Sequence, residues 1–565
     1  MENTSAYFQE IIELFSKKKY SFKKVNQLKV QLCRKYKMKH IPTSIEIMLH
    51  ATPKQLKLLK KNILSKPTRS MSGVAPIAVM TAPFPCPHGK CIFCPGGPNS
   101  EFGNVPQSYT GKEPSTMRAI RGNYDPFLIV FNRLEQFIIA GHLPNKAEVI
   151  VQGGTFPALP VEYQEQFITG IYQALNDFSR LFFKKDELNI EKIRTFFELP
   201  ADFTDEKRRL RLQKKILALK KKTTLQKEQK RNETSAIRCV GLTIETKPDW
   251  GFAEHGNKML ELGVTRIELG VQSVYEEPLK ICHRGHTLAD TQKSIQELKD
   301  LGFKLNFHYM LGLPAVSKEM ESVGLRELFD NPAYKPDMLK IYPCMVMKGT
   351  PLYELWKAGK FVPITTATAA EIIADFMRYV PSYCRIMRVQ RDIPTYMTEA
   401  GVDRTNLRQY IEKIMQDKNI QTQEIRSREI GRLLHKNPEL TFKKPQIKIL
   451  EYDASEGKEF FISLEDNSAL FGFLRMRFPS ECLRKEITTD SALIRELHIY
   501  GAATAFGKKG TVQHRGLGKQ LMKIAEKIAK KNRKNKIIVI SAVGTREYYK
   551  KIGYKKEGVY MVKKI

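Results

Sequence analysis

Short apolar runs alternate with helical stretches between residues 75 and 380, and this alternation constrains the fold more than any other feature. Runs with the length and composition of strands lie at 148–152, 239–245, 266–271, 304–310 and 338–342. Consecutive parallel strands need a helical crossover, so repeated strand-then-helix units predict an α/β fold with a parallel sheet, open or closed as a barrel. In such barrels the loops after the strands carry the chemistry.

Three cysteines, Cys86, Cys91 and Cys94, stand ahead of these strands with the spacing C-x4-C-x2-C. Three thiolates can hold an iron–sulfur cluster and leave one iron open to a ligand from outside the protein. Radical chemistry with S-adenosylmethionine (SAM) needs such an open iron. A structural zinc site with His88 as fourth ligand is one alternative, although such sites normally use two spaced ligand pairs. A disulfide pair is another.

Three strand ends carry candidate contacts for SAM. Gly153, Gly154 and Thr155 close the first run, where glycine lets a ligand approach the backbone and hydrogen-bond to it. Glu245 ends the second run, and Gln272 follows the third, where it could reach a ribose. An ordinary glycine turn and a solvent-exposed carboxylate are the alternatives.

Residues 446–565 contain further strand candidates and a glycine loop that leads into an amphipathic helix. Such a loop is a ready anion site, because free amides and the positive end of the helix dipole face the ligand. Its spacing, Q/R-x-x-G-x-G/A, is that of the pyrophosphate loop in acetyl-coenzyme-A-dependent N-acetyltransferases. The predicted coenzyme-binding residues of the loop are Gln513, Arg515, Gly516, Leu517, Gly518 and Lys519.

Two further segments complete the predicted acyl site. The strand before the loop would offer its backbone to the pantetheine arm, through Glu496, Leu497, His498 and Ile499. Tyr548 and Tyr549 lie on a later helix, where a phenol could protonate the thioester sulfur as a general acid. Tyr549 is also a candidate coenzyme contact. Aromatic packing against the helix is the alternative for both tyrosines.

The net charge of +34 predicts a polyanionic partner, and nucleic acid is the default. The charge is uneven: residues 1–70, which are expected to form a basic helical module, carry 16 Lys and Arg against 4 Asp and Glu. Residues 184–235 look like a charged insertion, either helix-prone or disordered. Whether this insertion contacts RNA or is merely solvated stays open, as does a plain packing role for the first module.

The remaining signals concern compartment and metals. No apolar run approaches the roughly 18–20 residues of a membrane span, and the N-terminus lacks the layout of a signal peptide, so a cytoplasmic protein without membrane contact is expected. Cys344, Cys384 and His435 could form a zinc site between domains. Buried free cysteines are the alternative.

Ordered motifs along the chain resemble those of the catalytic subunit of Elongator, in the single-chain form of archaea and some bacteria. The clearest are the cysteine loop, Gly153-Gly-Thr-Phe156, Glu245-Thr-Lys-Pro-Asp249, Gly270-Val-Gln-Ser-Val-Tyr275, Val389-Gln-Arg-Asp-Ile-Pro394, Arg495-Glu-Leu-His498 and Tyr548-Tyr-Lys-Lys-Ile-Gly-Tyr554. The matching stretches run from about residue 66 to the C-terminus and leave out 184–235.

The resemblance implies a radical-SAM partial (β/α) barrel fused to a GNAT-type N-acetyltransferase domain. The expected division is 1–70 for tRNA binding, 71–380 for the radical-SAM domain, 381–445 as a connector and 446–565 for the acetyltransferase-like domain. The implied cofactors are a [4Fe-4S] cluster on the three cysteines, SAM and acetyl-coenzyme A. The implied reaction places a carboxymethyl group on carbon 5 of the wobble uridine of tRNA, recognised through its anticodon stem-loop.

The family pattern also places Lys146 in contact with the acyl donor. The protein is expected to act alone or as a homodimer, with accessory subunits left open. Ser427 stands where some relatives carry a cysteine, which weakens the zinc expectation. Two other functions stay open: a protein lysine acetyltransferase with a structural cluster, and an RNA-binding scaffold with degenerate sites.

Overall fold

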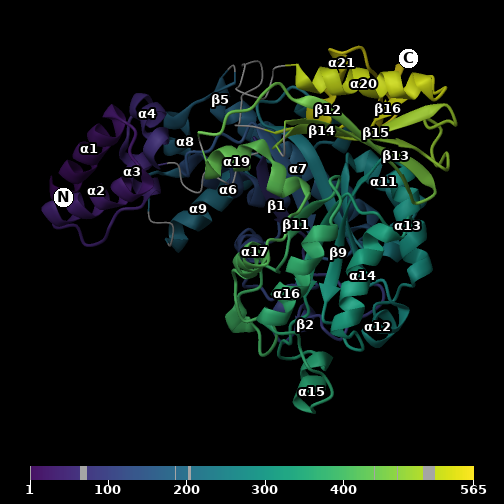
Figure 1. The fold of residues 1–565 in the computed structure, drawn as a ribbon. Coiled ribbons are helices and arrows are strands. Elements are labelled where there is room, and N and C mark those ends of the chain that lie inside the picture. Colours follow the sequence, from purple (N-terminus) through teal and green to yellow (C-terminus); the bar gives the residue numbers. More distant parts are fainter. Residues whose placement is uncertain are drawn as a thin grey trace.

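The computed structural model describes residues 2–63, 73–184, 186–201, 205–437, 439–466, 469–500 and 516–565. Figure 1 shows a small helical unit at the N-terminal end, a central sheet flanked by helices and a second sheet that carries the C-terminus. The expected combination of a partial barrel and a second α/β unit is confirmed. None of the helices in the described ranges has the length and apolar character that a membrane span needs.

Four helices form the N-terminal unit: α1 (Glu2–Lys17), α2 (Phe22–Lys35), α3 (Ser44–His50) and α4 (Pro53–Ile63). They enclose a core of their own, in which Tyr7, Ile11 and Phe15 of α1 are almost fully buried. The apolar spacing on α1 therefore marks the inner face of a helix bundle. A capping box at Thr43 and Glu46 fixes the start of α3.

The central sheet contains seven parallel strands in the order β1-β4-β7-β8-β9-β10-β11. The strands are β1 (Ala75–Met80), β4 (Lys146–Gln152), β7 (Arg238–Thr246), β8 (Arg266–Gln272), β9 (Lys304–Leu311), β10 (Met338–Pro343) and β11 (Arg385–Arg388). The five runs identified in the sequence correspond to β4 and β7 through β10. The outer strands β1 and β11 do not pair with each other, so the sheet is an open, partial barrel.

Helices cover the outer face of this sheet (Figure 1). The main ones are α6 (Pro126–Ile139), α7 (Val161–Phe182), α11 (Ala253–Leu262), α13 (Leu288–Asp300), α14 (Lys318–Asp330) and α16 (Thr366–Phe376). α6 begins where Asp125 accepts a hydrogen bond from the amide of Leu128, with Pro126 in the first turn, which are the usual start signals of a helix.

The predicted insertion contains three helices: α8 (Ile190–Phe197), α9 (Glu206–Leu217) and α10 (Leu225–Asn232). α10 packs against α7, where the side-chain amide of Asn176 donates to the carboxylate of Glu228 over 2.8 Å. Both side chains are buried. The described part of the segment is therefore an ordered element of the central domain.

The C-terminal sheet has the strand order β12-β13-β14-β15-β16-β18-β17. Its elements are β12 (Gln446–Ala454), β13 (Gly457–Asp466), β14 (Ala469–Phe478), β15 (Ser491–Ile499), α20 (Leu517–Lys531), β16 (Lys536–Val539), α21 (Arg546–Lys550), β17 (Lys555–Glu557) and β18 (Tyr560–Lys564). The amphipathic helix expected after the glycine loop is confirmed as α20, on which Leu521, Ala525 and Ala529 are buried. One continuous hydrophobic core joins this sheet to the central one.

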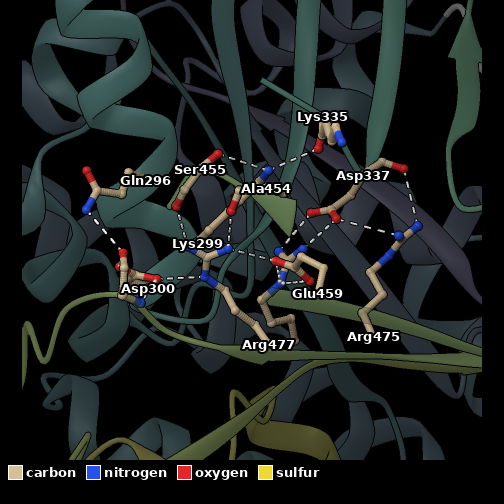
Figure 2. Close-up of polar contacts among 12 residues, drawn as sticks. Gln296, Lys299, Asp300, Lys335, Asp337, Ala454, Ser455, Glu459, Arg475 and Arg477 are labelled. Atoms are coloured by element: carbon tan, nitrogen blue, oxygen red, sulfur yellow. Dashed lines mark hydrogen bonds and ion pairs between the residues drawn. The ribbon is translucent and has the colours of Figure 1, made fainter. Parts of the chain in front are cut away.

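Buried ion pairs also hold the two sheets together (Figure 2). Arg477 of β14 donates to Asp300 at the end of α13 over 2.6 Å and contacts Glu459 of β13 at 3.2 Å. Arg495 of β15 forms two hydrogen bonds with Asp337, the residue just before β10, at 2.6 and 2.9 Å. The side chains of all five are at most 1% exposed. The C-terminal sheet thus sits on the amino-terminal ends of β9 and β10.

Asp337 is the acceptor on which this interface converges. Burial alone would raise the pKa of Asp337, but Arg495 and Arg475 outweigh burial and hold its pKa well below the usual range. Its carboxylate also accepts the amide hydrogen of Leu305 over 2.9 Å. Buried charged groups need such complete pairing, because removing one partner leaves the others as uncompensated charges without solvent.

Replacing Asp337 with asparagine should destabilise the protein by about 3–5 kcal/mol, because two buried arginines lose their shared counter-charge. Urea denaturation followed by circular dichroism measures the loss. The matched control is Asp330→Asn on the exposed end of α14, which should leave the midpoint unchanged. Equal midpoints for the two variants would contradict the role assigned to Asp337.

Candidate active site

Loops at the carboxyl ends of the central strands surround one cavity. The cysteine loop follows β1, and the glycine turn follows β4. Sequence-predicted residues from four separate segments line this cavity: Cys86, Cys91, Cys94, Gly154, Thr155, Glu245 and Gln272. The topology brings them together because parallel strands present their carboxyl ends at one edge.

The three thiols are held in a dense polar shell. The amide of Ser108 donates to Cys94 Sγ over 3.3 Å, and the imidazole Nε2 of His88 lies 3.2 Å from Cys91 Sγ. Arg284 Nη1 lies 3.7 Å from the same sulfur. Burial, and after it the neighbouring Cys94, raises the pKa of the Cys86 thiol to about 11. Ionising all three thiols here requires a strongly cationic group, which an iron–sulfur cluster supplies.

The same residues fit a single metal ion poorly. Within the described ranges, no three His, Cys, Asp or Glu side chains are arranged to hold one ion. A cluster does not need such convergence, because each cysteine binds a different iron. The cysteine loop therefore fits an iron–sulfur cluster better than the zinc alternative.

The glycine turn forms a cradle beside this loop. Gly153 and Gly154 have φ values of +129° and +105°, a region that residues with a Cβ rarely adopt. A Cβ at Gly153 would lie 2.0 Å from Oγ1 of Thr81. Buried Oε1 atoms of Gln152 and Gln272 line the same cavity and have no hydrogen-bond partner within the described structure. Unpaired buried acceptors beside bare backbone suit a polar ligand such as SAM.

Glu245 belongs to the cavity wall and does not face open solvent. The phenol of Tyr109 and the amide of Gly153 each lie 3.3 Å from its carboxylate. Burial, and after it the like charge of Glu268, raises the pKa of Glu245 to about 7. Its proton is therefore exchangeable near neutral pH.

A buried ionic cluster that the sequence analysis missed forms another part of the wall. Glu268 of β8 contacts Nε2 of His308 at 2.7 Å and the ammonium of Lys340, and both partners line the cavity. Burial would lower the pKa of Lys340, but Glu268 outweighs it and raises that pKa. Charged residues inside otherwise apolar strands were the available signal. Lys247, Arg284, Arg388 and Arg391 also line the cavity, so that with Lys340 the wall contains five cationic side chains.

The acyl-site candidates gather at the start of α20. A Cβ on Gly518 would lie 2.8 Å from the hydroxyl of Tyr548 and 3.8 Å from Cδ2 of Leu497. The Tyr548 hydroxyl is buried without a partner among the described atoms, and burial raises its pKa to about 12. Gly516 begins the helix with φ +84°, and the exposed Lys519 lies in its first turn. The predicted Gln513 and Arg515 lie outside the described residues.

Tyr549 differs from its neighbour. Its side chain is 7% exposed and packs edge-on against Tyr554 with ring centroids 6.0 Å apart. This geometry favours the packing alternative for Tyr549.

β15 carries the other predicted acyl contacts. Beyond Ile494 the described strands pair β15 with β14 alone, so one backbone edge of Glu496 to His498 faces away from that partner. The carboxylate of Glu496 is occupied by Lys304 at 2.7 Å and Arg475 at 3.0 Å. Burial acts to raise its pKa, but these cations lower it to about 2. The side chain of Glu496 is thus structural, and His498 and Ile499 follow on the same strand.

Lys146 is the first residue of β4, and its backbone lies opposite Arg238 in the parallel pairing of β4 with β7. It therefore lies at the amino-terminal edge of the central sheet, the edge that faces the C-terminal sheet. A Cβ on Gly544, just before α21, would lie 2.6 Å from Cβ of Arg238. Burial lowers the pKa of Lys146. The structure thus places Lys146 on the side of the acyl-site candidates.

The expected zinc site between domains is not supported. Cys344 and Cys384 are buried in different hydrophobic clusters, and His435 is exposed on α19 (Ile430–Lys436). As noted, the described residues contain no group of three metal-binding side chains. Both cysteines are packed in apolar surroundings, as the alternative reading expected.

Replacing Glu245 with glutamine should stabilise the protein as pH rises. The unfolded carboxyl ionises near pH 4.5 and the folded one near 7, so ionisation costs wild-type stability progressively between these values. The variant keeps an acceptor oxygen and escapes this cost. Its melting temperature should exceed that of wild type by several degrees at about pH 8 and match it near pH 4.5. Glu261→Gln, on an exposed side chain, should show no pH-dependent gain.

Comparisons with known proteins agree with this architecture. Family models match as an ELP3 N-terminal domain over residues 4–71, the Radical SAM superfamily over 84–323, a Radical_SAM C-terminal domain over 336–417 and an acetyltransferase (GNAT) domain over 440–564. The Radical SAM family is defined by a [4Fe-4S] cluster with SAM, and the GNAT family by acetyl-coenzyme A.

Similar proteins match over nearly their whole length. The tRNA uridine(34) acetyltransferase of Methanocaldococcus infernus is 43% identical over 96% of this chain and 95% of its own. Human Elongator complex protein 3 is 38% identical over 95% and 93%. The solved structure of M. infernus Elp3 with an N-terminal deletion covers 88% of this chain and 100% of its own, with a TM-score of 0.71 and 38% identity. The chain belongs to the Elp3 family of radical-SAM and GNAT proteins.

Proposed function

We propose that this protein modifies uridine 34 of tRNA, using SAM-dependent radical chemistry and acetyl-coenzyme A to build a carboxymethyl group on carbon 5. The observation that carries the proposal is the presence of two distinct sites on two sheets that share one hydrophobic core. A cysteine-lined cavity lies at the carboxyl ends of the central strands, and an acyl-binding candidate lies on the sheet that covers their amino ends. The names of the archaeal relatives support the substrate.

Cys86, Cys91 and Cys94 would hold the cluster. When bound, the cluster supplies the electron that cleaves SAM. The backbone of Gly153, Gly154 and Thr155 would receive the amino group of SAM, since glycine there leaves the cradle bare.

Other wall residues prepare the cavity for a nucleotide. Glu245 and Tyr109 share a hydrogen bond, so a proton can be held or released at the carboxylate near neutral pH. Gln272, whose buried Oε1 has no partner in the described structure, would accept a hydrogen bond from a ribose hydroxyl. The cations of Lys340, Arg388 and Arg391 would attract the phosphate of an extruded nucleotide.

The acyl site uses different elements. The N-terminus of α20, with Gly516, Leu517, Gly518 and Lys519, would bind the coenzyme pyrophosphate. Lys146 would contact the acyl donor. The hydroxyl of Tyr548 points at this helix start, and with its raised pKa it stays a phenol that can give a proton to the departing coenzyme sulfur while water supplies the carboxylate oxygen.

Residues 1–70 would bind tRNA, 71–380 would perform the radical chemistry, and 446–565 would bind the acyl donor. Residues 381–445 would connect the last two.

Cys91→Ala should abolish product formation, because one of three cluster ligands is lost. The assay incubates unmodified tRNA with anaerobically reconstituted protein, SAM, acetyl-coenzyme A and reductant, and detects carboxymethyluridine by mass spectrometry. Cys482→Ala, on an exposed cysteine, is the control and should retain activity. Peptide acetylation that needs neither SAM nor reductant and survives Cys91→Ala would favour the lysine acetyltransferase instead.

Tyr548→Phe should slow product formation by about 10²-fold or more while SAM cleavage continues, because only the general acid is removed. Tyr549→Phe is the matched comparison, since that ring packs in the core and should keep most of the activity. Product formation and 5′-deoxyadenosine are measured in the same reaction. Loss in Tyr549→Phe with retention in Tyr548→Phe would reverse the assignment of the two tyrosines.

A further inference from the structure

The insertion links the N-terminal helices to the central domain. Arg194 of α8 donates from Nη2 to the backbone oxygen of Met48 over 3.1 Å and to that of Ala51 over 2.5 Å. These carbonyls close the C-terminal end of α3, where helix carbonyls lack intrahelical partners and a cation is favourable. In Figure 1, α8 and α9 lie between the N-terminal helices and the central domain.

α9 is fixed along α6 in a defined direction. Near its start, the buried Arg208 contacts Glu135 in the second half of α6 at 3.5 Å. Further along, the side-chain amide of Gln213 donates to the backbone oxygen of Arg121. Just after its end, Lys220 pairs at 2.8 Å with Asp125, the residue that caps the start of α6. α9 therefore runs antiparallel to α6, from the side of the N-terminal helices toward α5 (Pro114–Arg121).

α5 connects the end of α9 to the active-site cavity. Glu113, which precedes the first residue of α5, lines the cavity together with Ser108 and Tyr109. The other end of α5 is Arg121, the contact of α9. The end of α9 and the turn that follows it thus lie one short helix away from the cavity rim.

The exposed side chains of α9 and of the turn that follows it carry an excess of positive charge. The acidic residues of the insertion are largely used inside it: Glu206 pairs with Arg209 at 2.6 Å, and Glu198 with Arg211 at 2.9 Å. Four exposed lysines have no ion pair within the described structure: Lys207, Lys214, Lys221 and Lys222. Lys207 and Lys214 are two helical turns apart, about 10 Å.

We propose that these four lysines form a phosphate-binding track for tRNA, which joins the basic N-terminal helices to the rim of the cavity. The proposal rests on the proposed function in naming tRNA as the RNA. If these lysines were only solvated, neither the direction of α9 nor the contact of α8 with the N-terminal helices would matter. A polyanion that binds both the N-terminal helices and the cavity rim needs basic residues along the path between them. Lys207 and Lys214 lie seven residues apart on α9, and Lys221 and Lys222 follow its end, so this surface offers four positive side chains that can each neutralise a phosphate.

The test replaces all four lysines with alanine in the full-length protein and measures tRNA binding over a range of salt concentrations. The affinity should fall about tenfold or more, and the slope of log affinity against log salt should become shallower by about 3, since each lost phosphate contact removes roughly 0.7–0.9. In the modification assay, the KM for tRNA should rise and kcat should stay unchanged.

The matched control replaces with alanine four exposed lysines of the C-terminal part of the chain: Lys530, Lys531, Lys551 and Lys555. It changes the net charge by the same amount and should keep both the affinity and the salt slope. Equal affinities and equal salt slopes for the two variants would overturn the proposal. The exposed lysines would then be either a contact for an acidic protein or simply solvated.

The outcomes separate this proposal from the proposed function. Binding of tRNA needs no SAM or acetyl-coenzyme A, so loss of affinity in the four-lysine variant supports the track even where wild type forms no product. Product formation by wild type with unchanged binding in the variant would uphold the function and overturn the track. A melting temperature equal to that of wild type excludes misfolding as the cause, and a salt slope that does not change excludes phosphate contact.

Discussion

The rest of the structure depends on one buried set of charges, the arginines of the C-terminal sheet against carboxylates at the base of the central one. Arg477 meets Asp300, and Arg495 meets Asp337, with no measurable exposure of either pair. Such pairs add little net stability against an apolar isostere, but they tolerate only one arrangement, because any slip strands an unsolvated charge. The continuous hydrophobic core supplies adhesion, and the ion pairs fix the relative orientation of the two sheets. The ion pairs and the shared core therefore define how the cavity and the acyl-site candidates lie relative to each other in this structure.

Between the two sites, the interior of the partial barrel is polar along its length. Glu496 of the C-terminal sheet meets Lys304 at the start of β9. Arg266 at the start of β8 contacts both Glu148 of β4 and Glu268, and Glu268 holds His308 and Lys340 in the cavity wall. Each charge has an opposite neighbour, which is the condition for burying so many of them. A polar lumen of this kind suits a reaction in which a charged nucleotide and an acyl group approach the same barrel from different ends.

The sequence was informative where chemistry depends on spacing along the chain, and silent where it depends on proximity in space. The central strands were identifiable from apolar runs, and the cysteine and glycine loops from residues a few positions apart. β11 was missed because its four residues, Arg385–Arg388, contain only two apolar side chains between two arginines, which is too short an apolar run to predict a strand. The ion pair between Glu268 and Lys340 was missed because the two residues lie far apart in the sequence. They meet only in the folded sheet, where β9 lies between β8 and β10. The zinc expectation for Cys344 and Cys384 failed for the same reason, since nothing along the chain shows that they lie in different clusters.

The interface between the sheets also has a consequence for the order in which the chain is made. The carboxylates of Asp300 and Asp337 are synthesised well before Arg477 and Arg495, which lie more than a hundred residues later. Until the C-terminal sheet has been made, Asp300 and Asp337 lack Arg477 and Arg495, and water must solvate their carboxylates in place of these arginines. The central domain can close its base only when the last part of the chain emerges. A truncated product that lacks the C-terminal sheet would therefore expose the carboxylates of Asp300 and Asp337 at the base of the central sheet.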